Sequence, residues 1–275
     1  STQSRSSAAS DVYKRQQQEA SRKLGFGVTR TMSTAQKLYE AGLITYMRTD
    51  SVTISNEAKS SIVQKIENKY GEDYVNLRDY KNKNKSAQEA HEAVRPTDIN
   101  IEEITSDYDQ QRLYHLIWKR TISSQMSDAQ IERTVVNIKS DSYNEFFVAR
   151  GEVIKFDGFL RVYNEGTDDE IEEEKGVLPA LSINENLNLL SISSRESFSR
   201  PPSRFTEASL VKKLEELGIG RPATYATTIS TIQNRGYISK GVNEGLDRNY
   251  NLLEFSKNGI KESQLKEKTG SNKGK

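Results

Sequence analysis

The chain contains no cysteine and only two histidines, His91 and His115, among its 275 residues. The absence of cysteine excludes disulfide bonds, thiolate nucleophiles and cysteine-ligated zinc sites together. Two histidines alone cannot build a histidine-based metal centre. The composition therefore excludes metal sites built from cysteine or from histidine alone.

Apolar residues are also scarce, at 34% of the chain with a mean hydropathy of −0.77. A chain of this length has room for two or three cores, and so low a hydrophobic content favours extended modules over one compact globule. No apolar run approaches the ~20 residues of a membrane span, and no secretory signal is evident. We therefore expect a cytoplasmic protein without a membrane partner. The 40 basic and 39 acidic side chains nearly cancel, so net charge indicates no partner.

The first half of the chain is patterned for helices. Residues 1–16 carry serine and charge without apolar periodicity, which predicts a disordered tail that need not be native. From Gln17 the pattern is helical, and Gly42 is placed to end the first long helix. Ser55 is a candidate N-cap for a second helix that ends at Tyr70, and a third is expected at about 107–126. These signals predict a helical domain over residues 17–130.

Near residue 130 the spacing of apolar residues changes from a helical repeat to every second residue. Stretches at 132–140, 145–163 and 186–194 alternate apolar and polar residues, which predicts a β-rich segment over 131–200. The acidic run between them, at 165–176, fits a solvated hairpin tip better than a metal site, because contiguous charges rarely face one ion.

Helical patterning returns after residue 201. A helix at about 206–218 is followed by a glycine-containing turn, a second helix opened by Pro222, and Gly236 as its stop. Residues 201–275 are therefore expected to form a helix-turn-helix-like segment. The whole pattern predicts a multidomain α+β protein.

A candidate for nucleophilic chemistry lies in "LITYMRTDS", where Tyr46 and Arg48 are two residues apart. Side chains two apart in an extended segment project to the same side. A phenol has a pKa of about 10, and a nearby guanidinium favours the phenolate while offering a donor fork for phosphate oxygens. The pair would suit attack on a phosphodiester. Spacing alone, however, favours a core tyrosine beside a surface arginine.

Two further stretches carry phosphate-binding side chains. "HEAVRPT" places His91 and Arg95 next to a proline that forces an extended backbone. "GIGRPATYA" places Arg221 and Thr224 at a helix start, where free N–H groups and the helix dipole favour phosphate. A structural histidine and an ordinary helix cap remain alternatives for these two stretches.

Taken together, "LYEAGLITYMRTDS", "AHEAVRPTD" and "RFTEASLVKKLEELGIGRPATYATTISTIQNRGYI" strongly resemble the bacterial topoisomerase I branch of the type IA DNA topoisomerases. The resemblance runs from Gln17 to the C-terminus. It implies a winged-helix-like tyrosine domain, part of a β-rich arch and part of a helical base. It also implies that Tyr46 is the nucleophile and that Arg48 holds the scissile phosphate. The DNA-binding residues expected from the motifs are His91, Arg95, Arg221, Thr224 and Arg235.

The sequence departs from this family at its ends. The family begins with a Toprim domain, whose D-x-D-x-E motif handles Mg²⁺, and the nearest string here, "DYDQQ" at 107–111, fits a helix cap better. We therefore expect a fragment that is inactive alone, with Mg²⁺ bound by the missing domain. The implied function is single-strand DNA cleavage, strand passage and religation without ATP, by a monomer that acts on single-stranded regions of negatively supercoiled DNA in the bacterial cytoplasm. The alternative is a non-catalytic helix-turn-helix-type DNA-binding module.

Overall fold

A computed structural model of the chain describes residues 19–49, 51–80, 91–140, 144–163, 178–179, 181–199, 202–221, 223–241 and 245–269. Two compact units are present. The first combines Ser1–Pro179 with Phe205–Ser230, and the second combines Ala180–Arg204 with Thr231–Lys275. Each unit thus joins segments that are distant in the sequence, whereas the predicted boundaries at 130 and 200 divided the chain consecutively.

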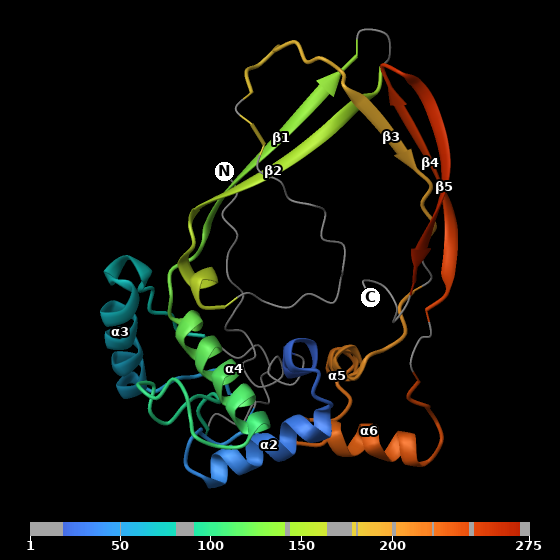
Figure 1. Cartoon of the computed structure of the whole chain (residues 1–275). Coiled ribbons are helices and arrows are strands. Elements are labelled where there is room, and N and C mark those ends of the chain that lie inside the picture. The colour runs from blue at the N-terminus through green and yellow to red at the C-terminus, as the bar shows by residue number, and fades with distance from the viewer. Residues whose placement is uncertain are drawn as a thin grey trace. The chain divides into compact units, whose positions relative to one another are not determined.

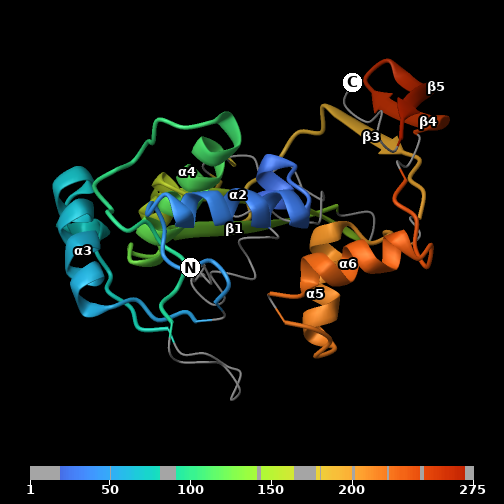
Figure 2. The ribbon, with the colours of Figure 1, turned by 90° about the horizontal axis from the view of Figure 1, so that it is seen from below.

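The first unit begins with helices (Figure 1). A short π-helix, η1 (Ala20–Leu24), precedes α2 (Val28–Glu40), α3 (Asn56–Tyr70) and α4 (Tyr108–Ser124). Helices α2 and α4 pack against each other, as Figure 2 also shows. The Arg30 side chain of α2 reinforces this contact by donating two hydrogen bonds of 2.7 Å to the Asp109 carboxylate of α4.

Local capping explains where these helices begin and end. The Ser55 hydroxyl accepts a hydrogen bond from the Ala58 N–H, and Asp107 does the same for Gln110, so both helices start where a side chain satisfies an unpaired donor. Gly42 follows α2 with φ of 71°, a conformation that favours glycine. The predicted helix limits at Tyr70 and near residue 107 are confirmed, and the capping interpretation of "DYDQQ" is correct.

The core of this unit is centred on α4. Trp118 is 2% exposed, and its indole N–H donates to the Ile99 carbonyl at 2.8 Å. Tyr114 is 1% exposed and donates to the Ile101 carbonyl at 2.7 Å. Burial raises the pKa of Tyr114 to about 12. These bonds fasten the irregular segment after residue 91 to the helix while keeping the buried polar atoms paired.

A two-stranded antiparallel ribbon follows α4. Strand β1 (Gln130–Lys139) pairs with β2 (Phe146–Phe156), and the ribbon extends away from the helices in Figure 1. The predicted strand at 145–163 ends earlier, because a 3₁₀-helix, η3 (Gly158–Arg161), replaces its last part. Gly158 has φ of 49°, and a Cβ there would lie 2.5 Å from the Ser127 carbonyl oxygen. Only glycine permits this approach of two backbones.

The pair of helices α5 (Glu207–Glu216) and α6 (Tyr225–Asn234) returns to α2. Val28 of α2 is buried in one cluster with Val211, Tyr225 and Ile229. The prediction that Pro222 opens the second helix was wrong in its boundary, since α6 begins at Tyr225. Residue 222 itself lies outside the described residues. Gly236, with φ of 71°, follows the helix as predicted.

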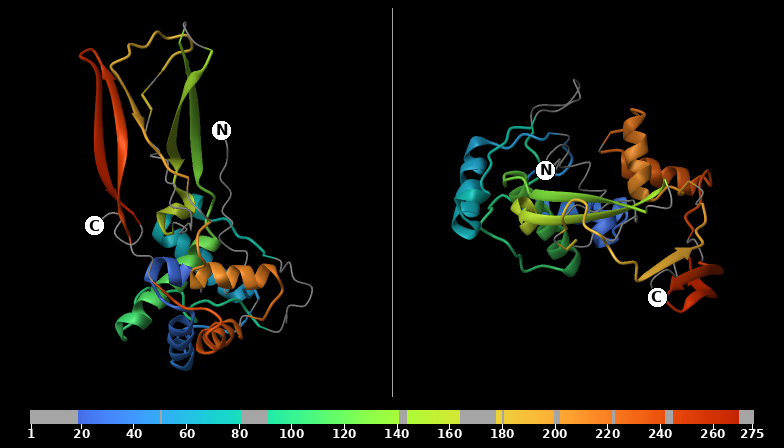
Figure 3. Two further views of the ribbon diagram at one scale, coloured as in Figure 1. Left: turned by 90° about the vertical axis from the view of Figure 1, so that its right-hand side faces the viewer. Right: turned by 90° about the horizontal axis from the view of Figure 1, so that it is seen from above.

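The second unit contains a three-stranded antiparallel sheet (Figure 3). Its order is β3 (Ser191–Arg195), β4 (Asp247–Ser256) and β5 (Gly259–Lys268). The sequence indicated a strand near β3, but the β4–β5 hairpin was missed within the segment expected to be helix-turn-helix-like. Mixed helical and antiparallel content agrees with the predicted α+β class. The acidic run at 165–176 lies outside the described residues. No helix among the described residues is long and apolar enough to cross a membrane.

Candidate active site

The backbone around Tyr46 is held by a short antiparallel pairing with the segment at 93–97. Thr45 donates its N–H to the Arg95 carbonyl at 2.9 Å, and its hydroxyl donates to the Ala93 carbonyl at 2.8 Å. The Arg95 N–H returns a bond to the Thr45 hydroxyl at 2.9 Å. Ile44 and Pro96 form the bridge of this pairing. The two motifs that the sequence singled out, 48 residues apart at their bonded ends, are therefore adjacent in the fold.

Alternation along this segment separates buried anchors from accessible groups. Met47 and Thr49 are 1% and 3% exposed, whereas Tyr46 is half-buried and Arg48 is exposed. Tyr46 also packs against the main core of the unit, so it combines the core position that spacing alone favoured with partial exposure. The buried anchors fix the backbone, while the Arg48 side chain is exposed and the Tyr46 side chain is partly exposed.

The Tyr46 ring contacts two other rings. The centroid of His91 lies 5.2 Å away at an interplanar angle of 43°, and that of Tyr39 lies 5.4 Å away, edge-on at 71°. His91 is exposed, so its imidazole is accessible to a bound phosphate next to the phenol. Arg48 forms no ion pair or hydrogen bond with any other residue in the described ranges, and its charge is thus uncommitted there.

Arg95 occupies a different position from the one expected of a DNA contact. Its side chain is 15% exposed, and its guanidinium donates to the Glu92 carboxylate at 2.6 Å and to the Pro96 carbonyl at 3.0 Å. The other Glu92 oxygen accepts the Ser55 N–H at 2.7 Å. In this arrangement Arg95 stabilises the loop, and its contact with DNA stays a prediction.

The charge state of Glu92 follows from these neighbours. Burial alone would raise its pKa, but the hydrogen bond from Ser55 and the charge of Arg95 outweigh burial and hold the pKa below its ordinary value. Glu92 is therefore ionised at neutral pH. It joins the start of α3 to the segment that holds Tyr46 in place.

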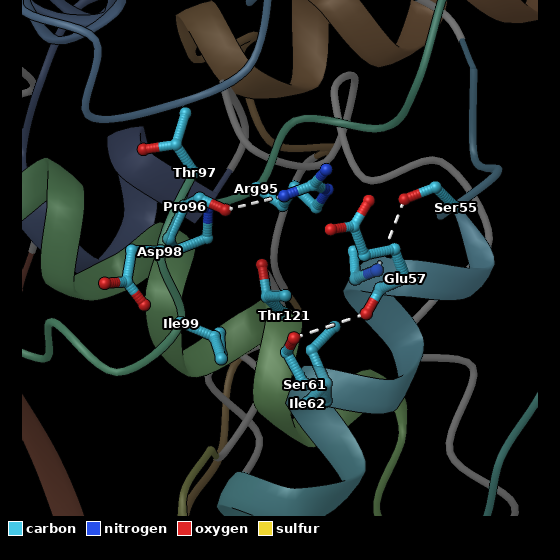
Figure 4. Close-up of a pocket in the computed structure, with 11 residues that line it drawn as sticks. Ser55, Glu57, Ser61, Ile62, Arg95, Pro96, Thr97, Asp98, Ile99 and Thr121 are labelled. Carbon is cyan, nitrogen blue, oxygen red and sulfur yellow. Dashed lines mark hydrogen bonds between the residues drawn. The ribbon is translucent and has the colours of Figure 1, made fainter.

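A cavity of about 220 Å³ lies between the first turn of α3 and the segment at 95–99 (Figure 4). Figure 4 shows the bond from Arg95 to the Pro96 carbonyl at its edge. The lining is mixed, since hydroxyl and apolar side chains accompany the guanidinium of Arg95 and the carboxylates of Glu57 and Asp98. Because the lining carries both positive and negative side chains, the cavity does not indicate one class of ligand.

Arg221 and Thr224 lie away from Tyr46 in the first unit. Arg221 and Thr224, both exposed, close a turn in which the Arg221 N–H donates to the Thr224 hydroxyl at 2.8 Å. The adjoining Tyr225 packs at the first turn of α2, whereas Tyr46 follows the end of that helix, about 18 Å along its axis. Arg235 belongs to the second unit. The structure thus brings His91 next to Tyr46 but does not bring Arg221 or Thr224 into contact with it.

Two residues of the site were missed from the sequence. The sequence gives Thr45 no role, although its hydroxyl makes two of the hydrogen bonds between the motifs. Tyr39 was read only as part of a helix, although its ring contacts Tyr46. The spacing of seven residues between the two tyrosines gives no signal, because the chain turns at Gly42 between them.

Comparison with known proteins decides the family. A family profile described as DNA topoisomerase matches residues 12–251. The chain belongs to the bacterial DNA topoisomerase I family. DNA topoisomerase 1 of Rickettsia conorii is 49% identical over 239 residues, and that of Streptomyces coelicolor is 48% identical over 235. The family predicted from the motifs is therefore confirmed.

The chain corresponds to part of such an enzyme. The matches cover 81% and 82% of this chain but only 30% and 25% of those two relatives. The structure of full-length topoisomerase I from Thermotoga maritima is similar with a TM-score of 0.64 at 36% identity, covering 83% of this chain and 38% of that one. Among the described residues, no group of three or more histidine, aspartate or glutamate side chains is placed to bind a metal ion.

Proposed function

We propose that this chain supplies the cleavage half of a type IA DNA topoisomerase and that Tyr46 is its nucleophile. The observation that carries the proposal is the placement of a half-buried Tyr46 beside the exposed His91 and two residues from the exposed Arg48, on a backbone fixed by Thr45. A nucleophile needs a firm position and access to its substrate, and this phenol has both.

The proposed reaction is a reversible transesterification. The Tyr46 Oη forms a bond to the phosphorus of one DNA strand, and the bond from that phosphorus to the 3′ oxygen breaks. The phenol proton must leave and the departing 3′ oxygen must gain a proton. Among the described residues none is hydrogen-bonded to the Tyr46 hydroxyl, so we assign these transfers to groups of the rest of the enzyme. Religation reverses the exchange without ATP, because the phosphotyrosine ester retains the energy of the phosphodiester bond that was broken.

The basic side chains of this chain bind and orient the strand. Arg48 offers a planar fork of N–H donors to the scissile phosphate, and His91 a further donor beside it. Arg221 and Thr224 would contact the strand farther away, and Arg235 is a further proposed contact. Because these contacts are directed at phosphate, binding to single-stranded DNA should weaken steeply with salt and show weak sequence selectivity. The described residues include no group that fits a metal ion, so we assign Mg²⁺ to the family's Toprim domain. Bound there, Mg²⁺ would neutralise phosphate charge.

The test is formation of a covalent adduct between protein and DNA. The chain is mixed with a labelled single-stranded oligonucleotide and Mg²⁺, with and without a separately prepared Toprim domain, and resolved on a denaturing gel. We expect an adduct only with the Toprim domain, and none from Tyr46→Phe. That variant keeps the ring and should bind DNA as well as the unmodified chain. Tyr237→Phe, at a tyrosine that is 70% exposed, is the matched control and should form the adduct normally.

Arg48→Lys tests the role of the guanidinium. An ammonium keeps the charge but cannot make two parallel bonds to phosphate, so adduct formation should fall by about tenfold or more while the protein remains folded. An adduct that survives in Tyr46→Phe would refute the assignment of the nucleophile. DNA binding with no adduct under any condition would instead support a non-catalytic helix-turn-helix-type module.

A further inference from the structure

Tyr39 occupies the last turn of α2 without belonging to its buried face. The residues of α2 that are buried are Val28, Thr31, Thr34, Ala35 and Leu38. Tyr39 remains 40% exposed. A large aromatic ring is thus kept at the surface directly beside Tyr46, and the packing of the helix does not explain it.

The contact between the two tyrosines leaves part of the Tyr39 ring open. Their centroids are 5.4 Å apart and their planes meet at 71°, so the rings meet edge to face. This arrangement covers less ring surface than parallel stacking would, which agrees with the exposure of Tyr39. The other ring in contact with Tyr46 is the imidazole of His91, which is polar, whereas the ring of Tyr39 is a second phenol.

We propose that Tyr39 is a stacking platform for a base of the single strand, the one that adjoins the phosphate held at Tyr46. The inference rests on the proposed function, because it requires that a phosphate lie at the Tyr46 hydroxyl. A base is joined through one sugar to its phosphate, so the base beside a phosphate at the Tyr46 hydroxyl stays close to this pair of rings, whose centroids are 5.4 Å apart. Tyr39 is then a DNA-binding residue that recognises a base plane, beside groups that recognise charge.

Stacking suits an enzyme that must accept many sequences. Every base presents a π-face, so an aromatic platform adds affinity without reading hydrogen-bonding edges. The contact would also fix the rotation of the nucleotide whose phosphate is attacked, which phosphate contacts alone leave free. The competing explanation is that Tyr39 merely braces the Tyr46 ring through van der Waals contact.

The experiment separates bases from phosphates. Affinity of the full chain is measured by fluorescence anisotropy for two labelled 12-mers of equal charge, oligothymidylate and an abasic deoxyribose-phosphate strand. Tyr39→Leu keeps an apolar side chain of similar bulk and removes the π-face, whereas Tyr39→Phe keeps the π-face. Phe146→Leu is the matched control, because Phe146 is 57% exposed at the start of β2, in the ribbon that extends away from the helices (Figure 1).

We expect Tyr39→Leu to weaken binding of oligothymidylate about fivefold or more and to leave the abasic strand and the salt dependence unchanged. Tyr39→Phe and Phe146→Leu should match the unmodified chain. Unchanged affinity of Tyr39→Leu for oligothymidylate would overturn the inference and favour the bracing role. Equal weakening toward both strands would overturn it as well, since the loss would then lie in phosphate contacts. If the unmodified chain binds neither strand, the proposed function fails first, independently of Tyr39.

Discussion

Replacing Glu92 by alanine should destabilise the helical part of the first unit. One Glu92 oxygen accepts the Ser55 N–H at 2.7 Å and the other accepts Arg95 Nη2 at 2.6 Å. The change removes both acceptors at once. It leaves the Arg95 guanidinium, 15% exposed, without its ionic partner and the N-terminal side of α3 without an acceptor for the Ser55 N–H.

The size of the effect follows from these two contacts. A hydrogen bond to a charged group contributes about 1.5–3 kcal/mol, and breaking a fully buried pair costs about 3–5 kcal/mol. The Glu92 side chain is 32% exposed, so water partly compensates and values near the lower end apply. We expect the free energy of unfolding to fall by about 2–3 kcal/mol. For a unit of this size that corresponds to a urea midpoint about 1 M lower.

The chain's single tryptophan provides the assay. Trp118 is 2% exposed in α4 and bonded to Ile99, so its fluorescence reports unfolding of the region that Glu92 stabilises. Glu103→Ala removes an equal charge from an exposed residue in the same region and should change stability by less than about 0.5 kcal/mol. A midpoint for Glu92→Ala equal to that of Glu103→Ala would refute the reasoning.

The dependence on pH adds a second check. Because the folded-state pKa of Glu92 is lowered, its contribution is present above the unfolded pKa of about 4.3 and is lost as the pH falls through the lower folded value. The difference between the unmodified chain and Glu92→Ala should therefore be constant near neutral pH and shrink below about pH 4. Because Arg95 is bonded to Thr45, adduct formation should suffer more than DNA binding.

Two further substitutions test the backbone and the long-range contacts. Gly158→Ala places a Cβ against the Ser127 backbone at a positive φ, so thermal unfolding should show a loss of about 2–4 kcal/mol. Gly241→Ala, in open space, should be neutral, and equal stability of the two variants would contradict the structure. Glu207→Ala removes the carboxylate that accepts the Val28 N–H at 2.7 Å and should cost about 1–2 kcal/mol by urea unfolding, against less than about 0.5 for the exposed Glu216→Ala. A smaller loss for Glu207→Ala than for Glu216→Ala would show that the cap is not formed in solution.

The parts of the fold that were predicted correctly depend on neighbours in the sequence. Ser55 caps a residue three positions away, and Gly42 ends α2 through its own backbone conformation. Such signals are complete within one turn of helix. The motifs around Tyr46 and His91 were recognised for the same reason, since each is short and contiguous.

What was missed depends on contacts between distant segments. Nothing near Gly27 indicates that the first N–H of α2 is satisfied by Glu207, 179 residues from its partner. The β4–β5 hairpin was missed because its strands are largely exposed and polar, which weakens the period-two pattern. The role of Arg95 was also missed. The sequence shows that its side chain is charged, but not that it is hydrogen-bonded to Glu92 and Pro96.

The cap from Glu207 has a consequence for the order in which the chain is made. The first turn of α2 has no side-chain cap from its own neighbours, and Val28 is covered by residues as late as Ile229. At about 5–20 residues per second, a ribosome needs roughly 10–40 s to travel that distance. During this interval the helix that leads to Tyr46 presents an uncovered valine and a frayed end to the ribosome surface and its chaperones. A nascent chain stalled before α5 should therefore be held or degraded, although every residue around Tyr46 has already been synthesised.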